Sequence, residues 1–253
     1  MSFKVVIPAR YGSTRLPGKP LRLIAGLPMI QRVFIRAMES EASEVVVATD
    51  DERISKACEG FGATVCMTRA DHISGTDRIA EVAAIRGWSD EEMVVNVQGD
   101  EPGLPAELID QVAGLLASRA DANIATLATP VADVEEFLNP NAVKVVADLT
   151  GRALYFSRAP IPWFRDSAAQ GLMSQQRFEG AWRHLGLYAY RVGALKKLAA
   201  TEPSPLELAE KLEQLRAMEM GMTIMVALAS CSPGHGVDTE EDLARVANHL
   251  SGS

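Results

Sequence analysis

The stretch FKVVIPARYGSTRLPGKP, which spans residues 3–20, decides the fold. Its short apolar run at 3–7 predicts a buried β-strand and leads directly into a loop at 8–19 that is rich in glycine and basic residues. In parallel sheets, ligands bind beyond the carboxyl ends of the strands. The stretch therefore predicts a parallel sheet whose first strand ends at a ligand site.

The chain beyond this loop alternates short β-branched runs with helical patterns. Such alternation produces βαβ units and a mostly parallel sheet. Continuous apolar strands such as 45–47 suit a sheet that is covered by helices on both faces. For this part of the chain we predict strands at 3–7, 44–48, 64–67 and 93–97, and helices near 28–41, 52–60 and 76–87 and after Pro105.

The pattern changes after residue 120, where strands follow one another with fewer helices between them. Residues 165–181 lack periodicity and predict a mobile loop. We predict a single domain over 1–253, an α/β fold of three layers with a mostly parallel nucleotide-binding sheet. Its part from about 125 to 200 would be a smaller mixed-sheet insertion for substrate and dimer contacts. The predicted elements are strands at 124–128, 142–147, 153–156, 185–190 and 223–228, a helix from Leu206 with the apolar stripe Leu208, Leu212 and Leu215, and a closing helix at 239–250.

The charge of the chain is unevenly distributed. The 25 basic and 33 acidic residues give a net charge of −8, yet residues 1–38 hold seven basic residues and no acidic one. An acidic body argues against nucleic-acid binding, which uses extended basic surfaces to neutralise phosphates. A short basic segment in such a protein indicates a local anion site.

Other features of the sequence exclude several classes of protein. The apolar runs are far shorter than the roughly 20 residues of a membrane-spanning helix, and Pro8 and Arg10 interrupt the first run, which argues against a signal peptide. We therefore expect a cytoplasmic protein without membrane insertion. The three cysteines lack a Cys-x-x-Cys spacing and the four histidines lack a His-Glu-x-x-His motif, so a disulfide framework and a zinc site are disfavoured.

The basic loop has the composition of a phosphate site. Glycines allow backbone N–H groups to converge on phosphate oxygens, and arginine and lysine neutralise the remaining charge. Five residues separate Gly12 from Gly18 and Pro20 follows Lys19, so the loop is not the P-loop of an ATPase. The absence of Gly-x-Gly-x-x-Gly argues against a dinucleotide oxidoreductase. A surface loop with solvated charges is the remaining alternative.

Two carboxylates are candidates for metal binding. Asp100 follows an apolar strand and is suitably placed to hold Mg²⁺ against a triphosphate, although a simple turn residue is an equal alternative. Asp238 directly precedes the last helix, where an N-cap is an equal alternative. For Asp50 and Asp51, which precede the helix near 52–60, capping is the favoured interpretation.

Two further segments suggest a bound nucleoside and a bound sugar. Residues 74–76 open a helix, where they either cap it or bind a phosphate or nucleoside with free N–H groups. Alternation along the strand at 183–191 leaves Leu185, Leu187 and Ala189 on the core face. The opposite face suits a sugar-like ligand, although a lone histidine is more often structural; it holds His184, Gly186, Tyr188 and Tyr190.

At this point the motifs resemble a known family. The opening IPARYGSTRLPGKPL at 7–21 closely resembles that of the 3-deoxy-D-manno-octulosonate (Kdo) cytidylyltransferases, or CMP-Kdo synthetases. Other sugar nucleotidyltransferases share this opening loosely, whereas the later segments are specific. The resemblance covers nearly the whole chain in order, through the segments 48–54, 74–78, 95–102, 153–158, 184–188, 212–216 and 236–239.

The resemblance implies a homodimer that uses Mg²⁺ to join CTP and Kdo into CMP-Kdo and pyrophosphate for lipopolysaccharide synthesis. It implies that Arg10 and Lys19 hold the triphosphate with Arg15 beside them, and that Asp100 and Asp238 bind the metal. The implied catalytic residues are Arg10, Lys19, Asp100 and Asp238. The implied cytidine site adds Ala9, Gly12, Ser13, Gly75, Thr76 and Gln98. The implied sugar site consists of Arg158, His184, Tyr188, Glu213 and Gln214.

The expected mechanism follows from charge. The anomeric hydroxyl of Kdo would attack the α-phosphorus of CTP in line, and both substrates are anions that cations must screen. Three alternatives stay open. The acceptor could be another acidic sugar, such as an amino-Kdo or a sialic acid. The chain could be a regulatory nucleotide-binding module, or a glycosyltransferase, although residues 98–100 are not the Asp-x-Asp motif which that class usually needs.

Overall fold

The computed structural model describes residues 2–12, 16–72, 74–167 and 170–251. Within these ranges the centre of the fold is a nine-stranded sheet. Seven of its strands follow one another in the order β11 (Ile224–Leu228), β7 (Ile124–Pro130), β10 (Trp182–Arg191), β6 (Met93–Asn96), β1 (Lys4–Ala9), β4 (Glu44–Thr49) and β5 (Thr64–Met67).

The sheet is mostly parallel, as the sequence predicts. Strand β1 pairs in parallel with both β4 and β6, and β5 and β11 also run parallel to their neighbours. The exception is β10, which is antiparallel to β6 and β7. The smaller antiparallel part continues from β10 through β8 (Lys144–Ala147) and β9 (Ala153–Ser157), and a separate hairpin pairs β2 (Leu23–Ile24) with β3 (Leu27–Pro28).

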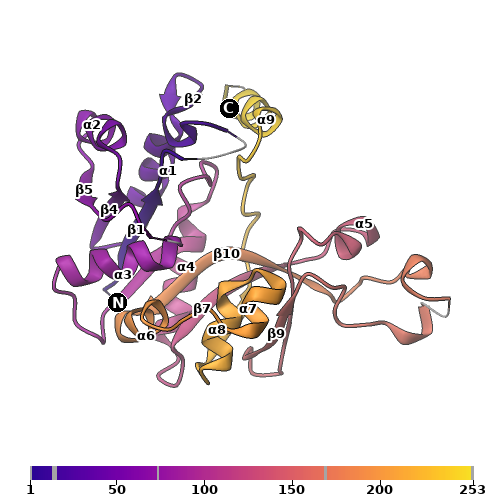
Figure 1. The fold of residues 1–253 in the computed structure, drawn as a ribbon. Helices are drawn as coiled ribbons and strands as arrows, with labels where there is room; N and C mark the ends of the chain where they lie inside the picture. The colour runs from indigo at the N-terminus through magenta and orange to yellow at the C-terminus, as the bar shows by residue number, and fades with distance from the viewer. Residues whose placement is uncertain (1, 13–15, 73, 168–169, 252–253) are drawn as a thin grey trace.

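Helices cover both faces of the sheet, which confirms the predicted three layers (Figure 1). Along β1, Val5 and Ile7 face one side and Val6 faces the other, because side chains alternate along a strand. The first face is covered by α1 (Met29–Met38), α2 (Glu52–Gly60) and α4 (Ala106–Ala117). The second is covered by α3 (Gly75–Ile85), α6 (Val192–Ala199) and α8 (Glu213–Glu219).

The last helix packs beside the basic loop. Helix α9 (Glu240–Ser251) contacts β2, and Figure 1 shows the two together at the edge of the molecule. Leu243 and Val246 of α9 are buried against Leu16 and Ile24. Because of this packing, the residues just before α9 lie near the carboxyl end of β1, although more than 200 positions separate the two segments in the sequence.

One predicted helix is wrong. The stripe Leu208, Leu212 and Leu215 predicts a continuous helix from Leu206, but the structure has α7 (Pro205–Glu210) followed by α8. Lys211 lies between them in the left-handed conformation at φ 55°, which ends α7 and changes the direction of the chain. Leu208 is consequently 52% exposed, whereas Leu215 is fully buried.

Several short elements lie outside the predictions. They include α5 (Val134–Leu138) and three single turns, η1 (Lys19–Leu21), η2 (Arg165–Ser167) and η3 (Leu172–Ser174). In the segment 165–181, Gln175 is buried and its side-chain oxygen accepts a hydrogen bond from Ser167 Oγ at 2.6 Å. The mobility of that segment and the single-domain organisation stay predictions.

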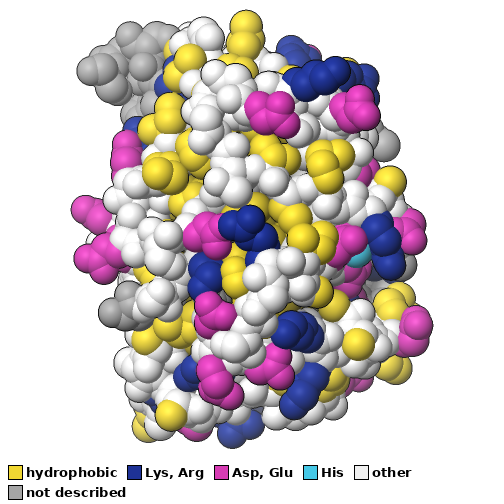
Figure 2. All heavy atoms as spheres, turned by 90° about the vertical axis from the view of Figure 1, so that its left-hand side faces the viewer, with side chains coloured by type: hydrophobic (Ala, Val, Ile, Leu, Met, Phe, Trp, Pro, Cys, Tyr) yellow, Lys and Arg dark blue, Asp and Glu magenta, His cyan; other side chains and the backbone are white. Residues whose placement is uncertain are grey.

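The surface carries both signs of charge. On the face that Figure 2 shows, Lys and Arg side chains lie among Asp and Glu side chains. Such mixing weakens any single-sign potential over this face. Among the described residues, none of the helices is long and apolar enough to span a bilayer.

Candidate active site

A cavity of about 330 Å³ lies at the carboxyl ends of β1 and β6, where the sheet topology predicts a ligand. It brings together the basic loop, the start of α3, the turn after β6 and the segment before α9. Its lining residues are Pro8, Ala9, Arg10, Lys19, Pro20, His72, Ser74, Gly75, Arg78, Gln98, Gly99, Asp100 and Asp238.

Lys19 lies between the two candidate metal ligands. Its Nζ is 2.7 Å from Asp100 Oδ2 and 2.9 Å from Asp238 Oδ1. The Lys19 ammonium group occupies the point in the cavity lining on which the two carboxylates converge, and a metal ion would bind at this point. Among the described residues, no group of three or more His, Cys, Asp or Glu side chains could hold a metal. Two carboxylates still fit Mg²⁺, which commonly takes one or two from the protein and the rest from phosphates and water.

The N-cap alternative for Asp238 is wrong. Thr239 Oγ1 accepts a hydrogen bond from the backbone N–H of Asp242, and Asp242 Oδ2 accepts from the N–H of Thr239, so Thr239 caps α9. The N–H of Val237 donates to the carbonyl of Asp100 at 2.9 Å and ties the two segments together. The Asp238 carboxylate is thereby directed toward Lys19.

The turn after β6 has little room for side chains. A Cβ added at Gly99 would lie 2.8 Å from the Pro8 carbonyl oxygen, so only glycine allows this turn to approach the end of β1. The next residue, Asp100, both belongs to this turn and lines the cavity, so the two interpretations of Asp100 are compatible. Glu101 follows it. Burial, together with the neighbouring Asp100 carboxylate and against an opposing effect of Lys19, raises the pKa of Glu101 to about 7. The sequence reasoning did not single out Glu101.

The start of α3 forms another wall of the cavity. Ser74 Oγ accepts from the Asp77 N–H, and the Asp77 carboxylate accepts from the Ser74 N–H, so of the two alternatives for residues 74–76 the helix cap is present. Ser74 and Gly75 both line the cavity. Thr76, which the resemblance assigns to the cytidine site, is buried and turns away, and its Oγ1 donates to Glu213 Oε2 at 2.6 Å.

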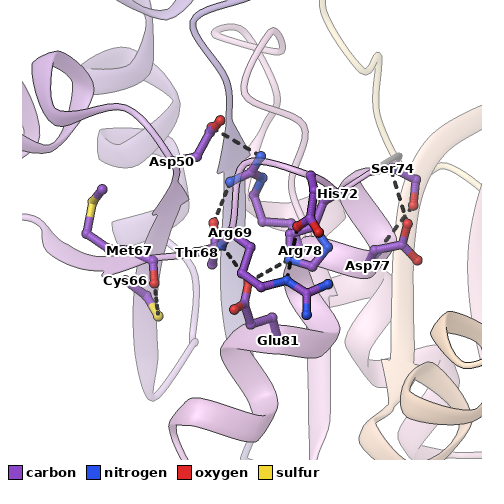
Figure 3. Close-up of polar contacts among 11 residues, drawn as sticks. Asp50, Cys66, Met67, Thr68, Arg69, His72, Ser74, Asp77, Arg78 and Glu81 are labelled. Atoms are coloured by element: carbon purple, nitrogen blue, oxygen red, sulfur yellow. Dashed lines mark hydrogen bonds and ion pairs between the residues drawn. The ribbon is translucent and has the colours of Figure 1, made fainter.

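Arg78 lies beneath this wall. Its guanidinium is 3.1 Å from Asp50 Oδ1 and also donates to Thr68 Oγ1 (Figure 3). Asp51 caps α2 as predicted by accepting from the Arg53 N–H, whereas Asp50 pairs with Arg78 instead of capping. The ion pair of the buried Arg78 with the half-buried Asp50 therefore connects the end of β4 to the cavity.

The remaining predicted nucleotide residues are placed as follows. Ala9, Arg10 and Gln98 line the cavity, with the Arg10 residue exposed. Gly12 is described but is not among the lining residues. Ser13 and Arg15 lie outside the described residues.

Three predicted sugar residues line another cavity, of about 230 Å³, across the first turn of α3. They are Tyr188, Glu213 and Gln214. Gln214 Nε2 and Glu213 Oε1 are buried and have no hydrogen-bond partner among the described residues, although Glu213 Oε1 lies 3.8 Å from the Arg216 guanidinium. Buried polar atoms are nearly always paired in folded proteins, so these atoms point to a polar ligand. Burial raises the pKa of Tyr188 well above its usual range, so its hydroxyl stays protonated.

The structure does not bring Arg158 and His184 to the lining of these two cavities. The Arg158 guanidinium donates to the carbonyls of Glu210 at 2.7 Å and Pro140 at 2.8 Å, so it fastens the loops beside β9. His184 packs edge-on against Phe156, with ring centroids 5.0 Å apart. Alternation correctly separates the two faces of β10, but it does not indicate that α6 and α8 cover the face with the aromatic residues.

Comparison with known proteins agrees with this geometry. The cytidylyltransferase family model matches residues 4–224. A 3-deoxy-manno-octulosonate cytidylyltransferase of Thioalkalivibrio sulfidiphilus is 57% identical over 250 residues, which cover 99% of both chains. One of Pseudomonas fluorescens is 58% identical over 98% of both chains.

Comparison with solved structures also finds cytidylyltransferases. CMP:2-keto-3-deoxy-manno-octonic acid synthetase complexed with CTP is 39% identical, with a TM-score of 0.89 over 99% of this chain and 98% of that one. A cytidylyltransferase from Leptospira borgpetersenii, 16% identical with a TM-score of 0.63 over 100% of this chain and 87% of that one, shares the fold. The resemblance in the motifs is confirmed, and the chain belongs to the 3-deoxy-manno-octulosonate cytidylyltransferase family.

Proposed function

We propose that this protein transfers the cytidylyl group of CTP to the anomeric hydroxyl of Kdo, forming CMP-Kdo and pyrophosphate for lipopolysaccharide synthesis. The observation that carries the proposal is the convergence of Asp100 and Asp238 on Lys19 at the end of β1. The names of the close relatives and the CTP bound to the similar synthetase support the two substrates.

Charge explains why these residues suit the reaction. CTP and Kdo repel each other as anions, so their approach requires cations at the point of contact. Lys19 and Arg10 supply positive charge in the first cavity and would stabilise the leaving pyrophosphate. Asp100 and Asp238 would hold Mg²⁺, which when bound polarises the α-phosphate and lowers the pKa of the attacking hydroxyl.

The sugar would bind in the second cavity. Glu213 and Gln214 offer a carboxylate and an amide there, and such groups exchange hydrogen bonds with the hydroxyls of a sugar. Thr76 connects Glu213 to the wall of the first cavity, so the two substrates would meet across the start of α3. Positioning and electrostatics then supply the catalysis, and no covalent nucleophile is required.

The test is release of pyrophosphate from CTP with Kdo, an amino-Kdo or a sialic acid as acceptor. We expect turnover with Kdo at a kcat/KM well above the other sugars, loss of activity in EDTA, and recovery on addition of Mg²⁺. CTP binding without pyrophosphate release would instead support the regulatory module. Turnover only with another sugar would contradict Kdo as the acceptor, and full activity in EDTA would contradict the metal.

We also propose that the protein is a cytoplasmic homodimer. The segment that holds β8, β9 and the loop after it projects from the main body (Figure 1), and it exposes Leu154, Trp163 and Leu172. Exposed apolar side chains gathered on one segment are typical of subunit contacts. Light scattering after gel filtration should give twice the chain mass, and Leu154→Glu should shift the protein toward the monomer. A monomeric wild-type protein would contradict the proposal.

A further inference from the structure

His72 is one of the residues that line the first cavity. Lys19, Asp100 and Asp238 give this lining charged groups, whereas Ser74 and Gly75, which follow His72 closely in the sequence, are uncharged and suit a nucleoside. The His72 side chain is only 8% exposed. A ring held so closely in a cavity wall presents a fixed edge to whatever binds there.

Glu81 of α3 fixes the orientation of this ring. Glu81 Oε2 lies 2.5 Å from His72 Nε2 and also accepts the backbone N–H of Arg69 at 2.9 Å (Figure 3). One carboxylate oxygen thus connects the helix to two points of the loop that precedes it. The ring can neither rotate nor flip without breaking its contact with Glu81.

The same contact determines which ring nitrogen carries the proton. Burial raises the pKa of Glu81, but the hydrogen bonds from His72 and from the Arg69 N–H outweigh burial, so the pKa is lowered overall. An ionised carboxylate can only accept hydrogen bonds, so Nε2 of His72 is the donor. In the neutral ring, Nδ1 then keeps its lone pair and is an acceptor.

We propose that His72 selects cytosine over uracil, with Nδ1 accepting a hydrogen bond from the exocyclic amino group of the base. Cytosine offers a donor at this position, whereas uracil offers a carbonyl oxygen whose lone pairs would face that of Nδ1. Glu81 is the positioning residue, because it holds the ring and its tautomer without touching the base. The inference rests on the proposed function in one respect, that the first cavity binds the nucleotide.

The experiment measures the dissociation constants of CTP and UTP by calorimetry on the full-length protein without sugar. In His72→Phe, which keeps a planar ring and loses both nitrogens, we expect the preference for CTP over UTP to fall by about tenfold, chiefly through weaker CTP binding. Arg69→Ala is the matched control. Its side chain is 68% exposed and its backbone N–H still binds Glu81, so the preference should not change.

Glu81→Gln separates positioning from a general structural effect. A side-chain amide can donate to Nε2 and move the ring proton to Nδ1, so the preference should fall in this variant as well. In the His72→Phe background, the same substitution should leave the preference unchanged, because no imidazole remains to be positioned. Should His72→Phe fail to fold, Glu81→Gln, which preserves side-chain volume, decides the question.

Three results would overturn the inference. They are an undiminished preference in folded His72→Phe, an undiminished preference in Glu81→Gln, and equal binding of CTP and UTP by the wild type. The outcome is independent of the acceptor sugar. Selective CTP binding that depends on His72 together with no turnover of Kdo would refute the proposed function and leave this inference standing.

Discussion

Asp100→Ala should lower the rate of pyrophosphate release from CTP and Kdo by roughly a thousandfold while the protein stays folded. Within the described part of the chain, Asp100 supplies one of the two carboxylates that converge on Lys19, and a methyl group cannot replace a ligand of a hard cation. The Asp100 side chain is 39% exposed and is not part of the hydrophobic core, so its loss leaves the packing of the core intact.

Steady-state rates with CTP and Kdo measure the effect, and circular dichroism and the Tm establish that the variant is folded. Asp121→Ala is a suitable control, because Asp121 is an exposed carboxylate that pairs with Arg119 in a turn far from the cavity. The control should retain wild-type activity. Near-normal turnover in a folded Asp100→Ala protein would overturn the assignment of Asp100 to the metal.

Acid should destabilise the protein through His184. Burial lowers the pKa of the His184 ring from an ordinary 6.5 to about 3. Below pH 6.5 His184 binds a proton in the unfolded chain, whereas in the folded protein it binds one only near pH 3. Between these pH values the unfolded state binds more protons, so the free energy of unfolding falls as the pH falls. By pH 4 this one residue should cost the native state roughly 3 kcal/mol of its free energy of unfolding.

Urea unfolding at pH 7 and pH 4 tests this, with His184→Phe as the informative variant. Phenylalanine retains a ring beside Phe156 and Tyr188 but cannot be protonated. Between pH 7 and pH 4 the free energy of unfolding of the variant should therefore fall by roughly 3 kcal/mol less than that of the wild type. The exposed His235 provides the control, and His235→Gln should behave as the wild type. An equal loss of free energy of unfolding in His184→Phe and the wild type would contradict the neutral state of the ring in the folded protein.

Local patterns in the sequence were sufficient to predict the parallel sheet and those site residues that lie in the segments after β1 and β6. Apolar runs ending in polar turns located β1 and β6, and the rule that ligands lie at strand ends placed Lys19 and Asp100 in one cavity. Asp100 lies in the turn directly after β6, and Lys19 lies in the loop segment that follows β1. Their position depends on the sheet alone and needs no knowledge of distant packing.

The positions of the remaining site residues depend on contacts between distant parts of the chain. Asp238 reaches the cavity because Leu243 and Val246 of α9 pack on Ile24, and the amphipathic pattern of α9 does not specify that partner. The break at Lys211 was missed because the leucine spacing is compatible with a continuous helix. For Glu213, only the resemblance to the family indicated a role, since its spacing alone is that of an ordinary surface acid.

The hydrogen bond between Thr76 and Glu213 has a consequence for how the two substrates influence each other. A ligand in the second cavity that engages Oε1 of Glu213 acts on the same carboxylate whose Oε2 holds the Thr76 hydroxyl, and it thereby acts on the first turn of α3, which is also a wall of the first cavity. We therefore expect the affinities of the two proposed sites to be thermodynamically linked. By reciprocity, whatever factor the sugar imposes on nucleotide affinity, the nucleotide imposes on sugar affinity.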